Sequence, residues 1–253
     1  MAPSKRLPCL SIVSLAALLL VSAVAASPVR GAILSIERPS SVDTGPDGLP
    51  SCAYADIATA HSSYGDWATT LLDPTYALPS DYAPTDLVSV GAAGVAGSGQ
   101  VRALVVDDLR AMAADAERAG APVAVLSAYR SYDDQVRTFN GWVEHDGYEQ
   151  ALTASARPGH SEHQLGTAID FQTLGGGAPW SVTDWATTAS GSWLAQNAWR
   201  YGFVMSYPKD KTAITCYEYE PWHYRYVGRS LAAQIHDSGT TTREFLWSLT
   251  VAA

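Results

Sequence analysis

The sequence predicts an α+β domain, in which a small, mostly antiparallel sheet is flanked by helices. Two segments with helical periodicity, residues 100–119 and 132–145, come early in the chain. Short β-branched or aromatic segments, typical of strands, lie mostly later in the chain. Because these segments do not alternate regularly as strand and helix, a parallel βαβ sheet is disfavoured.

The predicted elements follow one another from residue 78 onwards. Residues 78–84 form an extended lead-in, because two prolines restrict the backbone there. Apolar residues recur at helical spacing over 100–119, and Gly120 is suited to end this helix. A short apolar run at 122–126 predicts a buried strand, and 132–145 predicts a second helix. The remaining predicted elements are a loop at 155–166, strands at 167–171, 203–207 and 223–227, and helices at 193–201, 229–237 and 241–248.

The N-terminal part of the chain divides into a leader and an extension. Residues 1–26 have a positively charged start, an apolar run of about 17 residues and a small-residue cleavage site at 23–25. We expect a cleaved signal peptide, with an uncleaved membrane anchor as the alternative. Residues 27–63 are rich in Ser, Pro, Gly and Asp, which predicts a loosely ordered extension. The main domain is then predicted over residues 64–253.

Charge and cysteine content restrict the partners and the location. The formal net charge is −9, and removing Lys5 and Arg6 with the leader makes it −11. Without a basic patch, a nucleic-acid partner is not expected. Only Cys52 and Cys216 remain after the leader, and in an exported protein two cysteines most simply form a disulfide. We expect a secreted or cell-envelope protein with no stable membrane insertion once the leader is cleaved.

Two stretches, residues 161–170 and 220–223, carry side chains that suit a catalytic zinc site. His163, Asp170 and His223 offer two imidazoles and one carboxylate, all of which are good zinc ligands. Three protein ligands and a fourth position left to water are typical of catalytic rather than structural zinc sites. The chain has no His-Glu-x-x-His motif, which excludes a zincin-type metalloprotease.

Glu220 is the spare carboxylate of this set. Zinc lowers the pKa of a bound water from about 15.7 to roughly 7, and Glu220 would accept that proton. Pro221 removes a strand hydrogen-bond donor, which predicts an edge or a bulge that aims Glu220 at the site. Gly166 allows a sharp turn between the first two ligands. Arg130 follows a predicted strand and is a candidate to stabilise the oxyanion.

Several neighbouring residues have plainer interpretations. His160 lies three residues before His163 and is a rival ligand, which the register of the motif disfavours. Glu162 and Glu218 are expected to be solvated or structural acids. Ser161 is as suited to capping a turn as to contacting a substrate.

Three segments resemble the VanY-type zinc D-alanyl-D-alanine carboxypeptidases, a family grouped with Hedgehog signalling domains and lysostaphin-like enzymes. The segments are residues 127–131, 158–170 and 220–228. The resemblance implies a Hedgehog/D-Ala-D-Ala peptidase-like fold and zinc (Zn2+) as the cofactor. By the same resemblance the zinc ligands are His163, Asp170 and His223, the catalytic base is Glu220, Arg130 stabilises the transition state or holds substrate, and Ser161 and Gln135 contact substrate.

The resemblance also implies an activity for residues 64–253. It is that of an exported zinc carboxypeptidase that removes the C-terminal D-alanine from peptidoglycan stem peptides through a metal-bound water. Three alternatives stay open: an L,D-carboxypeptidase, an endopeptidase that cuts cross-links, and a metal-binding wall-recognition module without catalysis. Glu220 argues against the last, because a structural zinc site has no use for a base. The sequence makes no prediction of the oligomeric state.

Overall fold

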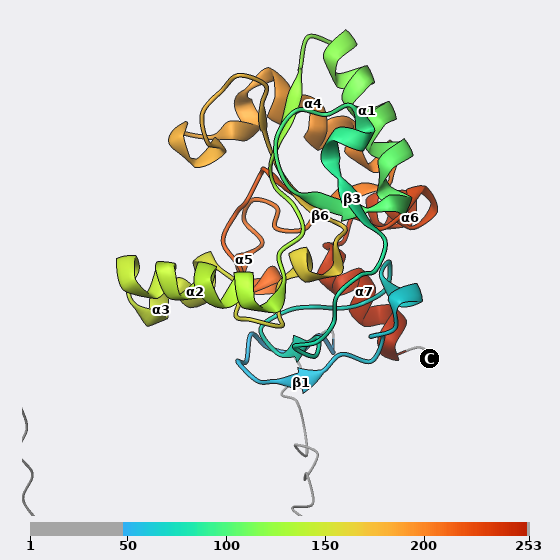
Figure 1. Ribbon diagram of the computed structural model, residues 1–253. Helices are drawn as coiled ribbons and strands as arrows, with labels where there is room; N and C mark the ends of the chain where they lie inside the picture. Colours follow the sequence, from blue (N-terminus) through green and yellow to red (C-terminus); the bar gives the residue numbers. More distant parts are fainter. Residues whose placement is uncertain (1–47, 252–253) are drawn as a thin grey trace, which may run out of the picture. The chain divides into compact units, whose positions relative to one another are not determined.

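A four-stranded antiparallel sheet forms the centre of the domain. The computed structural model describes residues 48–251, so the predicted leader and residues 27–47 lie outside the described residues (Figure 1). The strands are ordered β5-β6-β8-β7, and every neighbouring pair is antiparallel. Their bounds are β5 (Val123–Ser127), β6 (Ala168–Thr173), β7 (Phe203–Met205) and β8 (His223–Tyr226). The predicted α+β class with a mostly antiparallel sheet is confirmed.

Four further strands form two small ribbons outside this sheet. They are β1 (Ile57–Ala58), paired in parallel with β2 (Tyr76–Ala77), and β3 (Leu87–Ser89), antiparallel to β4 (Gln100–Arg102). The helices are α1 (Val106–Arg118), α2 (Tyr132–Asp146), α3 (Tyr148–Ala154), α4 (Ala189–Asn197), α5 (Thr212–Thr215), α6 (Arg229–Ser238) and α7 (Thr242–Val251). In the view of Figure 1, α2 and α3 project together to one side, and α1 and α6 lie on the other.

The predicted helix at 100–119 is wrong over its first six residues. Gln100–Arg102 pairs with β3 as a strand, and a 3-10 turn at Ala103–Val105 leads into α1. The helix predicted at 193–201 begins four residues earlier, where the Thr188 hydroxyl accepts a hydrogen bond from the backbone of Gly191. Pairing and capping partners decided these boundaries, and periodicity alone does not reveal such partners.

The core lies between the sheet and α1 and α4. Its buried side chains include Val105, Leu109, Met112, Val123, Val125, Ile169, Phe171, Leu194, Phe203 and Tyr224. Two of the strands that carry the candidate site, β6 and β8, are therefore buried within the sheet and flanked by packed side chains. Over residues 48–251, no helix has both the length and the apolar character needed to cross a membrane.

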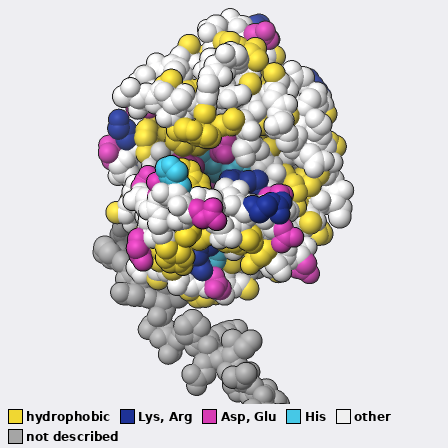
Figure 2. All heavy atoms as spheres, turned by 60° about the vertical axis from the view of Figure 1, so that its left-hand side comes forward, with side chains coloured by type: hydrophobic (Ala, Val, Ile, Leu, Met, Phe, Trp, Pro, Cys, Tyr) yellow, Lys and Arg dark blue, Asp and Glu magenta, His cyan; other side chains and the backbone are white. Residues whose placement is uncertain are grey.

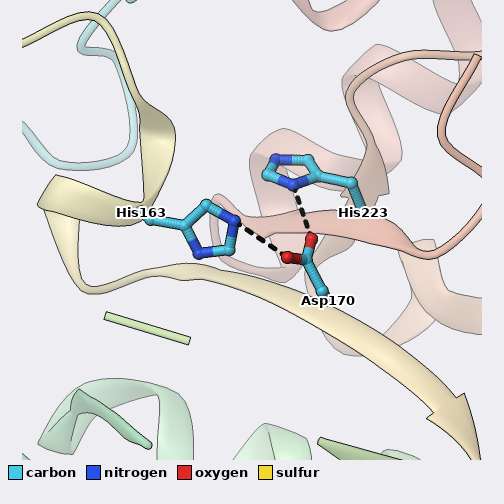
Figure 3. A group of neighbouring side chains, drawn as sticks. All are labelled: His163, Asp170 and His223. Atoms are coloured by element: carbon cyan, nitrogen blue, oxygen red, sulfur yellow. Dashed lines mark hydrogen bonds and ion pairs between the residues drawn. The ribbon is translucent and has the colours of Figure 1, made fainter. Parts of the chain in front are cut away.

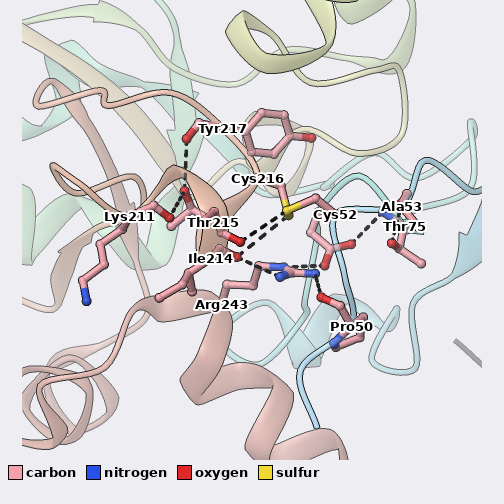
Figure 4. Close-up of a disulfide and its surroundings, with 12 residues drawn as sticks. Pro50, Cys52, Ala53, Thr75, Lys211, Ile214, Thr215, Cys216, Tyr217 and Arg243 are labelled. Carbon is pink, nitrogen blue, oxygen red and sulfur yellow. Dashed lines mark hydrogen bonds and ion pairs between the residues drawn. A yellow bond between two sulfur atoms is a disulfide. The ribbon is translucent and has the colours of Figure 1, made fainter. Parts of the chain in front are cut away.

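Residues 48–63 are fastened to the domain, although the sequence predicted a loosely ordered extension there. Cys52 forms the expected disulfide with Cys216, with Cα atoms 5.4 Å apart (Figure 4). The Asp56 carboxylate accepts a hydrogen bond from Arg157 at 2.8 Å and lies 3.0 Å from His160 Nε2. These partners lie about 100 or more residues away in sequence. Local composition therefore gives no sign of them.

Candidate metal centre

The register of the central sheet brings two of the candidate ligands together. Asp170 on β6 is the direct cross-strand partner of His223 on β8, so the two side chains share one face of the sheet. His163 lies on a short 3-10 turn, Glu162–Leu165, which immediately precedes β6. Figure 3 shows the three side chains converging on one point from these elements.

A tight reversal before β6 aims His163 back at the sheet. Gly166 ends the 3-10 turn with a φ of 71°, a conformation that L side chains rarely adopt. A Cβ at this position would lie 3.0 Å from the side chains of Arg102 and Leu87. Ser161 begins the same turn, and its Oγ accepts a hydrogen bond from the His163 backbone at 3.4 Å. The glycine expected from the sequence therefore meets both a conformational and a steric requirement.

The three side chains have the spacing of a metal site. The Nε2 atom of His163 lies 3.2 Å from Asp170 Oδ2, and Nδ1 of His223 lies 2.9 Å from Asp170 Oδ1. All three ligand atoms lie within 4.8 Å of one another. The Nε2 atom of His163 is buried and makes no hydrogen bond within residues 48–251. Two imidazole nitrogens and a carboxylate oxygen suit zinc and similar divalent ions, so the donor set fits a metal.

Each histidine is oriented by the nitrogen that faces away from this point. The backbone oxygen of Ala128 can only accept, so His163 donates from Nδ1 at 2.6 Å and keeps a lone pair on Nε2. The Nε2 atom of His223 lies 2.9 Å from Glu162 Oε2, which leaves Nδ1 facing the centre. Outer partners of this kind fix the tautomer of metal-binding histidines.

A bulge in β5 places the carbonyl that holds His163. The pairing of β5 with β6 shifts by one residue between Val125 and Ser127. Beyond this irregularity the chain continues to Ala128 and then to Arg130. The bulge predicted beside Pro221 is wrong, because residues 221–222 form a turn in which the His223 backbone donates to the Glu220 carbonyl. The predicted edge is wrong as well, because the strand that follows, β8, lies inside the sheet and is paired with β6 on one side and β7 on the other.

Burial sets the protonation of the centre. Burial lowers the pKa of His163 to about 4, and the positive charge of Arg130 adds to this effect. Burial alone would also lower the pKa of His223, but the carboxylates of Asp170 and Glu162 raise it to about 10. Burial raises the pKa of Glu220 to about 7, although the charge of His223 opposes this change. Near neutral pH, His163 is therefore ready to donate a lone pair, and Glu220 can both accept and release a proton.

A cavity of about 590 Å³ opens onto the three side chains. Figure 2 shows this hollowed face, with histidine and basic side chains inside the hollow. Arg130, Ser161 and Glu220 line the same cavity. One Glu220 oxygen lies 3.8 Å from Nδ1 of His223. Among the described residues, no carboxylate forms an ion pair with Arg130, and its buried Nε has no hydrogen-bond partner.

Two further residues considered from the sequence lie away from the cavity surface. Gln135 is buried on α2 and donates from its amide to the Ala156 carbonyl at 2.7 Å, so it supports the cavity wall rather than lining it. The ring of His160 contacts the Asp73 carbonyl at 2.7 Å and Asp56 at 3.0 Å. His160 therefore fastens the N-terminal segment and is not one of the three clustered groups.

Glu162 contributes to the centre in a way that the sequence analysis did not anticipate. It is only 5% exposed. It contacts His223, accepts a hydrogen bond from Ser206 at 2.6 Å, and pairs with Arg225 at 3.0 Å. Burial would raise its pKa, but Arg225 and then His223 lower it to about 2. The sequence holds a partial sign of this arrangement. His223 and Arg225 are two residues apart on a predicted strand, so their side chains face the same side, where one carboxylate can contact both.

A sequence model of the VanY family, described as D-alanyl-D-alanine carboxypeptidase, matches residues 98–229, which is more than half of the chain. The chain belongs to this family. YodJ of Bacillus subtilis (strain 168), named as a carboxypeptidase, is 40% identical over 179 residues, which cover 69% of this chain and 65% of YodJ. The chain spans less than two thirds of the length of the curated relatives it matches.

Two solved structures share the fold of the chain. The L,D-carboxypeptidase LdcB aligns with a TM-score of 0.62 and 38% identity, covering 70% of this chain and 84% of LdcB. The vancomycin-resistance D,D-pentapeptidase VanY, solved as a mutant with Zn(II), aligns with a TM-score of 0.61 and 29% identity. That alignment covers 71% of this chain and 99% of VanY. The solved structures that resemble this chain thus include a zinc-bound D,D-pentapeptidase and an L,D-carboxypeptidase.

Proposed function

We propose that this protein is a zinc-dependent carboxypeptidase of the cell envelope, which removes the C-terminal D-alanine from peptidoglycan stem peptides. One observation carries the proposal. The candidate ligands share a single cavity with a partly buried carboxylate, Glu220, and with an arginine, Arg130, that has no charged partner in the described part of the chain. Membership of the VanY family supports the same reaction.

His163, Asp170 and His223 would hold the zinc ion. A zinc ion bound there would supply Lewis acidity, acidifying a water molecule and polarising an amide carbonyl. The protein's own contribution is to fix the donors: the Ala128 carbonyl and the Glu162 carboxylate orient the two imidazoles, and the sheet register sets Asp170 beside His223. Three protein donors around a cavity are typical of a catalytic site, whereas a structural site would be closed by a fourth.

Glu220 is the proposed general base. Its carboxylate lies in the cavity beside the donor set, and burial brings its pKa to about 7. A group with this pKa accepts a proton from water at neutral pH and then returns it to the departing amine. A module that only bound the cell wall would need no such group, which argues against the non-catalytic alternative.

Arg130 is proposed to recognise negative charge on the substrate. A carboxypeptidase must bind a terminal carboxylate near the scissile bond, and leaving that anion buried without a partner would be costly. A guanidinium without a protein partner suits this role, and it equally suits the oxyanion of the transition state. Ser161 lines the same cavity and offers a hydroxyl. Gln135 would act indirectly, through the backbone of Ala156.

An L,D-carboxypeptidase activity on the tetrapeptide is the second candidate. The similarity to LdcB favours it, because the identity of 38% exceeds the 29% found for the D,D-pentapeptidase. An endopeptidase acting on cross-links would need no free carboxylate, and Arg130 argues for an exo-acting enzyme.

Mass spectrometry of products from defined peptides tests the proposal. The protein would be incubated with a stem pentapeptide, the matching tetrapeptide and the pentapeptide C-terminal amide, each with added zinc or with a chelator. We expect release of one D-alanine from the free pentapeptide, loss of activity with chelator, and cleavage of the amide at least ~100-fold less efficiently. Release from the tetrapeptide alone would establish the L,D activity. Equal cleavage of acid and amide would favour an endopeptidase.

A further inference from the structure

Glu162 is held at three points immediately behind the candidate metal centre. One oxygen, Oε2, lies 2.9 Å from His223 Nε2 and accepts from the Ser206 hydroxyl at 2.6 Å. The other, Oε1, accepts from Arg225 Nη1 at 3.0 Å. All four side chains are buried. Glu162 does not line the cavity, so it does not face a substrate.

We propose that Glu162 is a positioning residue that fixes the proton of His223 on Nε2 and thereby keeps the Nδ1 lone pair available to the metal. This inference rests on the proposed function and adds a fourth protein group on which metal binding depends. A carboxylate paired with arginine can only accept hydrogen bonds. The His223 nitrogen that faces Glu162 must therefore carry a hydrogen, so the proton that a metal ion would displace is the one on Nδ1, which faces the centre.

Arg225 prevents Glu162 from turning away. Its side chain is fully buried, and its Nη2 donates to the backbone carbonyls of Trp67 at 2.8 Å and Thr70 at 2.7 Å. The arginine thus connects the backbone of residues 67–70 with the carboxylate behind β8. Residues 67 and 70 precede the part of the chain that the family model matches. The segment before residue 98 therefore reaches the metal centre through Arg225 and Glu162.

The two histidine ligands differ in this respect. His163 is oriented by a neutral backbone carbonyl, at 2.6 Å from Nδ1. His223 is oriented by a charged side chain, so its orientation can be changed by one substitution without altering the backbone. A carboxylate also makes the imidazole a stronger electron donor than a carbonyl does.

Glu162→Gln tests the proposal, because glutamine cannot satisfy all the contacts. If the amide oxygen faces His223 and Ser206, the amide NH2 faces the donors of Arg225. If the oxygen instead faces Arg225, the NH2 faces His223 Nε2 and favours the tautomer that has a proton on Nδ1. The first arrangement loses the Arg225 contact that holds residue 162 against His223, and the second puts a proton on the nitrogen that faces the metal. We expect the dissociation constant for zinc, measured by chelator competition, to rise about 10- to 100-fold.

Matched variants and a spectroscopic measurement complete the test. Glu117→Gln makes the same change on the exposed face of α1 and should leave zinc affinity unchanged. Ser206→Ala removes one donor from Glu162 and should weaken zinc binding about 2- to 10-fold. In the zinc-loaded wild-type protein, the ¹⁵N shifts of His223 should show a protonated Nε2, and in Glu162→Gln this signal should weaken or exchange faster.

The outcomes separate this inference from the proposed function. Failure of the wild-type protein to bind zinc would overturn both. Zinc binding by the wild type with the same affinity in Glu162→Gln would overturn only the positioning role. If Glu162→Gln does not fold, Ser206→Ala and the wild-type ¹⁵N shifts decide, and a proton on His223 Nδ1 in the zinc-loaded protein would contradict the proposal.

Discussion

The ligand side of the candidate centre and its substrate side are built in opposite ways. On the ligand side, His163 and His223 each use the nitrogen that faces away from the centre for a hydrogen bond to the protein, and Asp170 lies between them. On the substrate side, no side-chain hydrogen bond of Arg130 or Glu220 occurs within residues 48–251. Both groups are nevertheless partly buried.

This difference distinguishes the groups that would bind the metal from the groups that would act on the substrate. A metal site needs donors whose orientation is fixed before the ion arrives, and their outer partners provide this. A group that must meet a substrate, or gain and lose a proton, is more useful when its hydrogen-bonding capacity is not already taken. Substitutions on the two sides should therefore separate metal binding from turnover.

Removal of a ligand should have the largest effect. His163→Ala deletes a donor and also leaves the Ala128 carbonyl without its partner. Loss of an outer partner typically weakens metal binding about 10- to 100-fold, and we expect loss of a ligand to weaken zinc binding by more than this, with turnover falling as well. Metal analysis after gel filtration measures this, with His236→Ala, an exposed histidine on α6, as the control. Full zinc content in His163→Ala would contradict the assignment of the ligand side.

The disulfide should affect stability and the substrate side, and should spare the ligands. Cys216 lies four residues before Glu220, whereas the two strands that carry Asp170 and His223 are joined by their own pairing. The double change Cys52→Ser and Cys216→Ser should lower the free energy of unfolding by about 2–4 kcal/mol. Urea denaturation measures this change. The folded variant should keep its zinc affinity and lose part of its turnover. Unchanged stability would show that the N-terminal segment is held without the bridge.

An effect confined to turnover should come from the cationic group of the substrate side. Arg130→Met should lower kcat/KM for the free pentapeptide about 100-fold, the size expected for losing one charged contact, while zinc content stays the same. Arg137→Met, an exposed position on α2, is the control. A fall in zinc content equal to the fall in activity would instead place Arg130 on the ligand side. Loss of activity confined to the acid peptide would assign Arg130 to the terminal carboxylate.

Much of the fold was predictable because its determinants are local. The helix predicted at 132–145 is α2, which the Ser131 cap and its capping box with Asp134 begin. The four predicted strands are present, since each is a short apolar or aromatic run in a buried sheet. By contrast, periodicity predicts helix for β4, because its apolar residues continue the spacing of α1 and only pairing with β3 distinguishes them.

The candidate ligands fall in two short motifs, residues 161–170 and 220–223, so their identity could be proposed without a structure. The groups that orient them could not. The partner of His163 is a backbone carbonyl 35 residues away, which no sequence pattern reveals. Arg225 lies 63 residues from Glu162 and more than 150 from Trp67. The fastening of residues 48–63 likewise depends on distant partners such as Arg157.

The most direct test of the division between the two sides is Glu220→Gln, with zinc content and turnover measured on the same sample. Glu220 lies only 3.8 Å from a proposed ligand, His223, so it is the residue for which a role in metal binding and a role in catalysis are hardest to tell apart. We predict zinc content equal to that of the wild type, and turnover lower by about 10²- to 10⁴-fold, as expected for loss of a general base. Loss of zinc from this variant, or turnover close to that of the wild type, would contradict the account.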